Sequence, residues 1–336
     1  MDVLFIILGS LALILIIAFV ILMFNFGKIF CEGTLHLRNP KRKQRKPKKA
    51  SKNPPPKKVD PVEKDRARIE ELRAAGEKWL ESMNPELVYI KSFDGLKLGA
   101  EFVPAKVEGS KKTFIGVHGY TANGHSDFGV VGQLFYEMGY NLLLVSQRAH
   151  RYSEGEYVTF GVYERFDCLN WIKYVNERIG EDGTIFLHGI SMGGATVLMA
   201  SSLELPENVA AIISDSAFTS PAEILSHVIR KSYHINPSII LPFLNMWSKA
   251  LAKYSFYDVS AEDTVRQAKV PILFIHGLDD DFVPSEMSKR SLEACASKKD
   301  FVFVEKAGHG ESYLVDNERC EATLKSFISN ILEEKN

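Results

Sequence analysis

TIFLHGISMG, residues 184–193, is the stretch that decides the fold expected for this chain, and the helix-compatible ATVLMA of residues 195–200 follows it. The apolar run before the first glycine predicts a buried strand, and the run after the second glycine predicts a helix. The Gly-x-Ser-x-Gly spacing between them predicts a sharp turn, because glycines leave room where backbone segments crowd. Such a turn presents its serine hydroxyl outward, which makes Ser191 a candidate nucleophile. A purely structural glycine turn has the same pattern, so the assignment depends on the rest of the chain.

A serine nucleophile requires a base to take its proton, a carboxylate to orient that base, and backbone donors for the oxyanion. On a sheet of this kind the acid and then the base follow the serine along the chain, on loops after later strands. The apolar run 270–275 predicts such a strand, and the turn after it contains Asp279, Asp280 and Asp281. Spacing favours none of the three, and a solvated acidic turn before a helix is the alternative.

His309 is the candidate base among the nine histidines. It alone follows the last predicted strand, residues 301–304, and precedes the last predicted helix. The candidate oxyanion donors are the backbone N–H groups of Tyr120 and Met192. Tyr120 lies in HGYT, residues 118–121, directly after an apolar run, and Met192 follows the serine. An ordinary tight turn is the alternative for residues 118–121.

Four motifs carry a resemblance to a known family: HGYT at 118–121, GISMG at 189–193, HGLDDDFVP at 276–284 and GH at 308–309. In this order they resemble the α/β-hydrolase superfamily, and within it the serine hydrolases that include monoglyceride-lipase-like and serine-aminopeptidase-like proteins. The resemblance covers residues 85–334. It implies an α/β fold with a mostly parallel central sheet flanked by helices, and with a helical lid. The family pattern G-x-x-D-x-x-V-P implies that Asp280 is the acid of a Ser-His-Asp triad.

The composition suits one large domain with appendages, because 46% of the 336 residues are hydrophobic and no internal repeat is visible. The four cysteines form neither a metal-like pair nor a disulfide framework. Triad chemistry requires no metal and no organic cofactor, so we expect neither.

The first appendage is the uncharged segment Val3–Phe24, which has 22 residues. As a helix it would be about 33 Å long, enough to span a bilayer. Met1 and Asp2 offer no positive side chain, so a transmembrane helix is expected in place of a cleaved signal peptide. Twelve Lys and Arg side chains lie in residues 28–58. By the positive-inside rule they predict a single-pass protein of the cell membrane, with its N-terminus outside and its catalytic domain in the cytoplasm.

The basic segment 38–58 is expected to contact membrane lipids, in addition to the contact that residues 3–24 make with the bilayer core. A disordered spacer that only sets the topology is the alternative. Nucleic acid is not expected as a partner, because no aromatic side chain interleaves the cations of this segment.

The expected domain organisation is a transmembrane anchor (1–27), a basic Pro- and Lys-rich linker (28–59), an amphipathic helix packing on the core (60–84) and the hydrolase domain (85–336). Within the last, residues 219–268 are strongly apolar and too long for an ordinary connection, so they predict the lid. The lid either buries a helical core of its own or lines an acyl-binding pocket. Pro237 and Pro242 are expected to divide it into separate helices.

These patterns predict a membrane-anchored serine hydrolase that cleaves carboxylic esters through a Ser-His-Asp triad and an acyl-enzyme. The apolar lid and the membrane segment favour lipophilic acyl esters, so the expected substrate is a small or lipid-like acyl compound. A serine peptidase or aminopeptidase, or a thioesterase, with the same triad is the alternative enzyme. A catalytically silent, membrane-tethered interaction module is the alternative that is not an enzyme.

Overall fold

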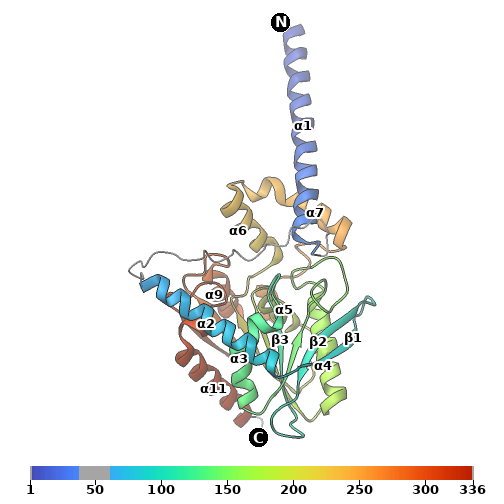
Figure 1. Cartoon of the computed structure of the whole chain (residues 1–336). Helices are drawn as coiled ribbons and strands as arrows, with labels where there is room; N and C mark the ends of the chain where they lie inside the picture. Colours follow the sequence, from blue (N-terminus) through green and yellow to red (C-terminus); the bar gives the residue numbers. More distant parts are fainter. Residues whose placement is uncertain (1, 38–60, 335–336) are drawn as a thin grey trace.

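The computed structural model describes residues 2–37 and 61–334, and an eight-stranded sheet lies at the centre of this described part (Figure 1). Its strands are β1 Glu86–Lys91, β2 Lys97–Val103, β3 Lys112–Val117, β4 Asn141–Val145, β5 Thr184–Ile190, β6 Val209–Asp215, β7 Ile272–Gly277 and β8 Lys299–Val304. They lie in the order β1-β2-β4-β3-β5-β6-β7-β8. β2 runs antiparallel to both of its neighbours, and all pairs from β4 to β8 are parallel.

Helices cover both faces of this sheet. The helices of the described chain are α1 Asp2–Thr34, α2 Pro61–Ser82, α3 Gly124–Glu137, α4 Glu164–Ile179, α5 Met192–Ala200, α6 Pro221–Tyr233, α7 Pro237–Ala252, α8 Ala261–Val265, α9 Ser285–Ala294, α10 Ser312–Val315 and α11 Asn317–Glu334. α2, α3 and α11 contribute to the core on one face, and α4, α5, α8 and α9 to the core on the other. Every residue of β4, β6 and β7 is therefore buried, as in other parallel sheets between helical layers. The predicted α/β architecture is confirmed.

The predicted lid region contains α6 and α7, followed by α8. The Ser220 hydroxyl caps α6, and the Asn236 side chain caps α7. Pro237 begins α7, as predicted, because its fixed φ suits the first turn of a helix. Pro242 lies inside α7, so the prediction that it divides the lid is wrong. The proline removes only one internal hydrogen bond of the helix. The helix continues because buried apolar side chains on either side of Pro242 keep α7 packed.

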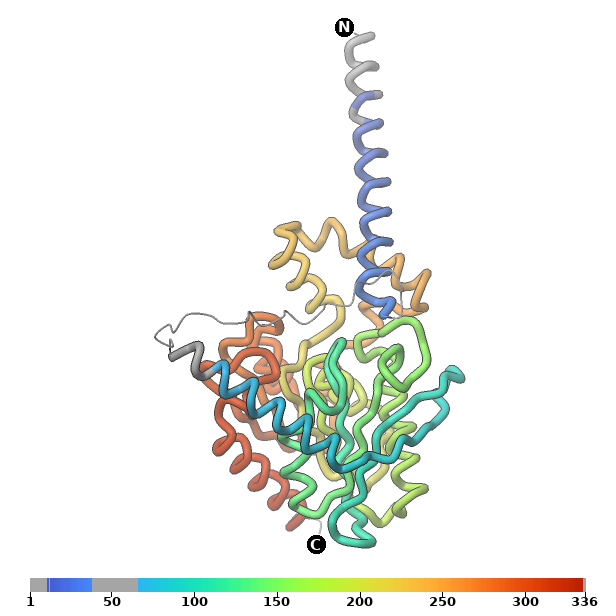
Figure 2. Tube along the Cα trace, viewed as in Figure 1, coloured from blue at the N-terminus to red at the C-terminus, as the bar shows by residue number. Residues whose placement is uncertain are grey.

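α1 is long and apolar enough to cross a membrane. The window Leu13–Thr34 has a mean hydropathy of 2.5, and most large apolar side chains between Leu11 and Phe24 are exposed. A signal sequence near the N-terminus meets the same criteria of length and composition. Figures 1 and 2 show α1 standing out from the body of the molecule beside α6 and α7. The predicted lipid-binding segment 38–58 lies outside the described residues.

The last turns of α1 are part of the folded core. The helix continues past the expected anchor boundary at residue 27. Cys31 on α1 and Leu35, which directly follows the helix, are 0% and 1% exposed, and both belong to the larger apolar core. The indole N–H of Trp247 on α7 donates a hydrogen bond to the carbonyl oxygen of Phe24 at 2.9 Å. The apolar segment and the buried end of α1 therefore form one continuous helix, and the predicted linker does not begin at residue 28.

The predicted amphipathic helix is α2, which crosses α3 at close range. A Cβ atom on Gly76 would lie 2.7 Å from the Gly129 backbone, and one on Gly129 would lie 2.5 Å from the Gly76 backbone. No side chain fits at such a crossing, so both positions require glycine. Leu80 of α2 is 0% exposed and lies in the core with the side chains of α3. α2 is thus a packed part of the domain.

We expect Leu35→Ala to destabilise the folded protein by about 2–4 kcal/mol, because a large-to-small change in a core leaves a cavity. In a domain of this size the melting temperature should fall by on the order of 5–10 °C. Ile29→Ala is the matched control, because Ile29 lies on α1, six residues before Leu35, and is 69% exposed. Scanning fluorimetry of the full-length variants in one detergent measures both. Equal melting temperatures for Leu35→Ala and wild type would mean that the end of α1 is not part of the core.

Candidate active site

Ser191 lies at the turn between β5 and α5, with φ 57° and ψ −115°. This backbone conformation is strained for a residue with a side chain, and such strain clusters at functional sites. Two close contacts explain the glycines of the motif. A Cβ atom on Gly193 would lie 1.8 Å from the carbonyl oxygen of Val117, and one on Gly189 would lie 2.1 Å from the carbonyl oxygen of Gly193. The turn therefore has the shape that the Gly-x-Ser-x-Gly spacing predicts.

Three side chains identified from the sequence form one hydrogen-bonded chain. His309, in the loop between β8 and α10, places its Nε2 atom 2.8 Å from Ser191 Oγ. The Nδ1 atom of the same ring lies 2.7 Å from Oδ2 of Asp280, in the loop after β7. All three follow the carboxyl ends of parallel strands, which lie at the same edge of the sheet. These distances allow a base to take a proton from a serine hydroxyl while a carboxylate orients the base.

Burial distinguishes Asp280 from its neighbours, since Asp279 and Asp281 are exposed. Asp280 Oδ1 accepts the backbone N–H groups of Phe282 and Val283 at 2.9 and 2.8 Å. Burial raises the pKa of the Asp280 carboxyl, but hydrogen bonds from two histidine rings and from the backbone outweigh burial and hold this pKa well below its usual range. Asp280 is therefore ionised at neutral pH, as an orienting carboxylate must be.

His276 is a second histidine beside Asp280, and no sequence pattern identified it. It is fully buried at the end of β7, where Nε2 lies 3.2 Å from Asp280 Oδ2 and 2.9 Å from the carbonyl oxygen of Val283. Its Nδ1 atom lies 2.7 Å from the Ser288 hydroxyl on α9. The ring thus attaches the loop of Asp280 to α9. Its place in the HGLDDDFVP motif was the available signal, but the motif does not reveal these contacts.

The two predicted oxyanion donors lie near Ser191. Met192 is the first residue of α5, where a backbone N–H has no partner within the helix. Tyr120 lies in the loop after β3 and lines the same cavity as Ser191. A Cβ atom on the preceding Gly119 would lie 3.3 Å from Ser191 Cβ, so this loop passes close to the serine. Asp127 on α3, which no pattern identified, accepts the Gly119 N–H at 2.7 Å and holds the loop in place.

A cavity of about 530 Å³ lies beside Ser191 and His309, a size that suits a small ligand. Side chains of α3, α10, β5 and β7 supply its apolar part. Its polar part includes Asp127 and also Arg73 of α2, whose guanidinium lies 3.8 Å from Glu311. Among the described residues that line it, none belongs to the lid region. This finding favours the alternative in which the lid buries a core of its own.

Asp215, at the end of β6, is a second buried carboxyl beside this cavity. Burial raises the pKa of Asp215 to about 6, although the Ser216 hydroxyl donates a hydrogen bond to its Oδ1 atom at 2.8 Å. The same hydroxyl accepts the N–H of Gly310 at 3.1 Å. Because Gly310 follows His309 directly, Ser216 attaches the loop of the candidate base to β6.

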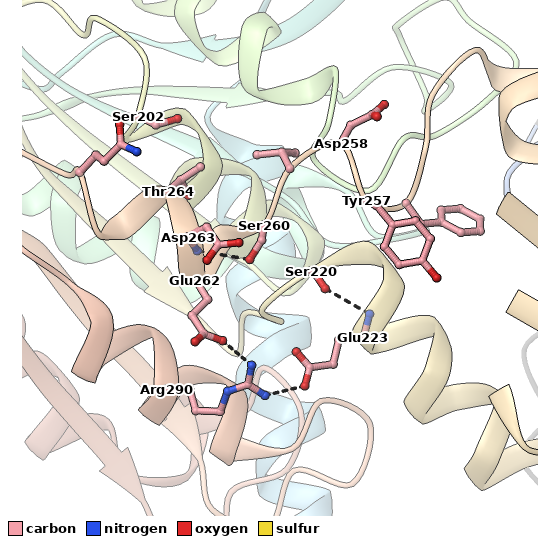
Figure 3. Close-up of a pocket in the computed structure, with 13 residues that line it drawn as sticks. Ser202, Ser220, Glu223, Tyr257, Asp258, Ser260, Glu262, Asp263, Thr264 and Arg290 are labelled. Atoms are coloured by element: carbon pink, nitrogen blue, oxygen red, sulfur yellow. Dashed lines mark hydrogen bonds and ion pairs between the residues drawn. The ribbon is translucent and has the colours of Figure 1, made fainter. Parts of the chain in front are cut away.

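A larger cavity, of about 680 Å³, lies where α6, α8 and α9 meet (Figure 3). Arg290 on α9 forms an ion pair with Glu223 on α6 at 2.5 Å and a second one with Glu262 on α8. These ion pairs attach the beginning of α6 to α8 and α9. None of the predicted site residues lines this cavity. The strained Ser191 and the buried Asp215, whose pKa is raised, line the smaller cavity, which is therefore the candidate active site.

The sequence profile described as the alpha/beta hydrolase fold matches residues 112–237, which include β3, the serine turn and α5. The chain has the α/β-hydrolase fold. Among solved structures, it resembles the esterase Pf2001 of Pyrococcus furiosus, with a TM-score of 0.60 and 22% identity over 74% of this chain and 93% of the esterase.

Two curated proteins are also similar to this chain. The protein YqkD of Bacillus subtilis (strain 168) is 27% identical over 65% of this chain and 72% of YqkD. The lysophosphatidylserine lipase ABHD12 of Danio rerio is 24% identical over 60% of this chain and 51% of the lipase.

Replacing Gly193 tests how strictly this fold depends on the close crossing at the serine turn. We expect Gly193→Ala to cost about 3 kcal/mol or more, because a methyl group 1.8 Å from the Val117 carbonyl oxygen forces backbone to move. Gly132→Ala on α3 is the control, since its Cβ atom would meet only ordinary contacts, the nearest at 3.6 Å. Alanine at this helical position should stabilise by about 0.5–1 kcal/mol. Soluble expression and melting temperature measure both, and a stable Gly193→Ala variant would contradict the explanation.

Proposed function

We propose that the chain is a membrane-anchored serine hydrolase that cleaves carboxylic esters, with lipophilic acyl esters as its substrates. The observation that carries the proposal is the hydrogen-bonded chain Ser191–His309–Asp280 at the edge of a cavity. The α/β-hydrolase fold supports hydrolysis as the reaction class, and the proteins that this chain resembles include an esterase and a lipase.

In the proposed reaction His309 takes the proton of the Ser191 hydroxyl while Oγ attacks the ester carbonyl carbon. The ionised Asp280 stabilises the imidazolium that forms. The N–H groups of Tyr120 and Met192 stabilise the negative charge on the former carbonyl oxygen. His309 then gives its proton to the leaving alcohol, and the acyl group stays on Ser191. A water molecule that His309 deprotonates attacks the acyl-enzyme, which releases the acid and restores the serine.

The lining of the cavity supports an amphipathic ester as the substrate. Apolar side chains such as Val131 and Leu314 suit an acyl chain, whereas Arg73 and Asp127 suit a polar alcohol portion. The Danio rerio relative is a lysophosphatidylserine lipase. The same triad chemistry also serves thioesters and peptides, so a substrate panel has to include both.

The contacts of α1 support a retained membrane anchor. A signal peptide is removed by cleavage, whereas Cys31 and Leu35 lie in the core and the Phe24 carbonyl is bonded to α7. Loss of this helix would expose apolar core surface. The cations in residues 28–58 support a cytoplasmic catalytic domain, which protease protection in intact cells tests directly.

Ser191→Ala should abolish labelling by a fluorophosphonate and lower ester hydrolysis by at least about 10³-fold, because no nucleophile remains. Ser202→Ala is the control, since Ser202 lines the other cavity. Hydrolysis of short-chain and medium-chain acyl esters, a thioester and an aminoacyl amide measures the substrate class. Absence of labelling in wild type, where a control hydrolase labels, would support the silent module; faster turnover of the amide would support a peptidase.

Asp280→Asn should lower kcat by about 10³- to 10⁴-fold, because a neutral amide neither stabilises the imidazolium nor holds the required tautomer. Asp279→Asn is the matched control, since Asp279 is the adjacent residue and is exposed. Its kcat should stay within about twofold of wild type. An equal loss of kcat in the two variants would mean that Asp280 is not the acid of the triad.

A further inference from the structure

The end of α1 contacts the loop that carries one proposed oxyanion donor. The Tyr120 hydroxyl donates a hydrogen bond to the carbonyl oxygen of Thr34, the last residue of α1, at 2.7 Å. The Tyr120 ring also stacks on Phe160, with ring centroids 5.6 Å apart and 20° between the planes. Since Tyr120 lines the cavity at Ser191 as well, its side chain links that cavity to the end of the membrane segment.

The residues after α1 extend this attachment. Two backbone hydrogen bonds, of 2.9 and 3.0 Å, join residues 35–37 to residues 156–158. Between them His36 pairs with Tyr157 as an antiparallel bridge, and the two rings stack with centroids 4.8 Å apart. The chain leads from this bridge to Phe160, the residue on which Tyr120 stacks. The end of α1 thus holds the Tyr120 side chain directly and through its stacking partner.

α1 also holds the lid helix α7. The Cys31 thiol donates a hydrogen bond to the carbonyl oxygen of Leu244 at 3.3 Å. Gly27 lets α7 come close, since a Cβ atom there would lie 3.2 Å from both Phe243 and Trp247. A larger residue at position 27 therefore forces the two helices apart.

From these contacts we infer that residues 24–37 are a positioning element of the active site, which holds the Tyr120 loop in the geometry that oxyanion stabilisation requires. The inference rests on the proposed function, because it takes the Tyr120 N–H as an oxyanion donor. Such donors act because they are held in place before the charge forms. A looser loop raises the barrier of the chemical step and leaves substrate binding nearly unchanged. Displacement of α1 in the bilayer consequently changes kcat.

Tyr120→Phe removes the hydroxyl that reaches Thr34 and leaves the backbone N–H in place. For the full-length protein in detergent micelles, we expect kcat for ester hydrolysis to fall about 5- to 50-fold and KM to change less than about twofold. Tyr163→Phe is the matched control. The Tyr163 hydroxyl donates to the carbonyl oxygen of Lys253 at the end of α7, at 2.5 Å, so the same kind of bond is lost without touching the Tyr120 loop. Unchanged kcat for Tyr120→Phe, or a change in KM alone, overturns the inference.

A second pair of variants acts from α1 and decides the matter even where Tyr120→Phe does not fold. Gly27 contacts α7, whereas a Cβ atom on Gly33 of the same helix would meet nothing within 4 Å. Fluorophosphonate labelling uses the oxyanion donors, so its rate should fall about 3- to 10-fold in Gly27→Leu and stay at the wild-type value in Gly33→Leu. Equal rates in the two variants overturn the inference. Failure of wild type to label contradicts the proposed function instead, so the two failures are distinguishable.

Discussion

The active site depends on one close crossing of backbone segments, where β3, the end of β5 and the beginning of α5 meet. The carbonyl oxygen of Val117 occupies the space that a side chain on Gly193 would need, and Gly189 meets the same helix turn. This crossing places α5 directly on the ends of two strands and raises Ser191 above the edge of the sheet. The strained serine is fixed by its own N–H, which donates to the Asp215 carbonyl oxygen at 2.8 Å. The strain is thus balanced by packing and hydrogen bonding on all sides.

The loops of the two partners of the serine also cross closely, since a Cβ atom on Gly277 would lie 2.3 Å from the carbonyl oxygen of Ala307. Buried polar side chains add to this attachment: His276 holds the loop of Asp280, and Ser216 holds the loop of His309. The Ser216 contact joins residues 94 positions apart, so the position of the base depends on neighbouring strands being in register.

Sequence patterns predicted those elements whose conformation is determined by residues close in the sequence. The serine turn was predictable because its glycines, its strand and its helix lie within one short stretch. Among three consecutive aspartates only the family motif distinguished Asp280, because burial depends on the tertiary fold. The roles of His276 and Asp127 were not predicted either: their partners lie only 4 to 12 positions away, but the contacts depend on how each loop folds. The docked end of α1 was missed because an apolar sequence has the same composition whether lipid or protein covers it.

Part of the polar wall of the cavity comes from outside the sheet. Arg73 belongs to α2, and the crossing of α2 over α3 at Gly76 and Gly129 brings that side chain to the cavity. The candidate site is thus assembled from two parts of different origin along the chain: strand-end loops that carry the proposed triad, and a preceding helix that forms part of one wall. Replacement of α2 by a helix of another sequence would change which molecules enter the cavity and would leave the bond-breaking groups in place. Selectivity and reactivity can therefore diverge independently among proteins that share this sheet.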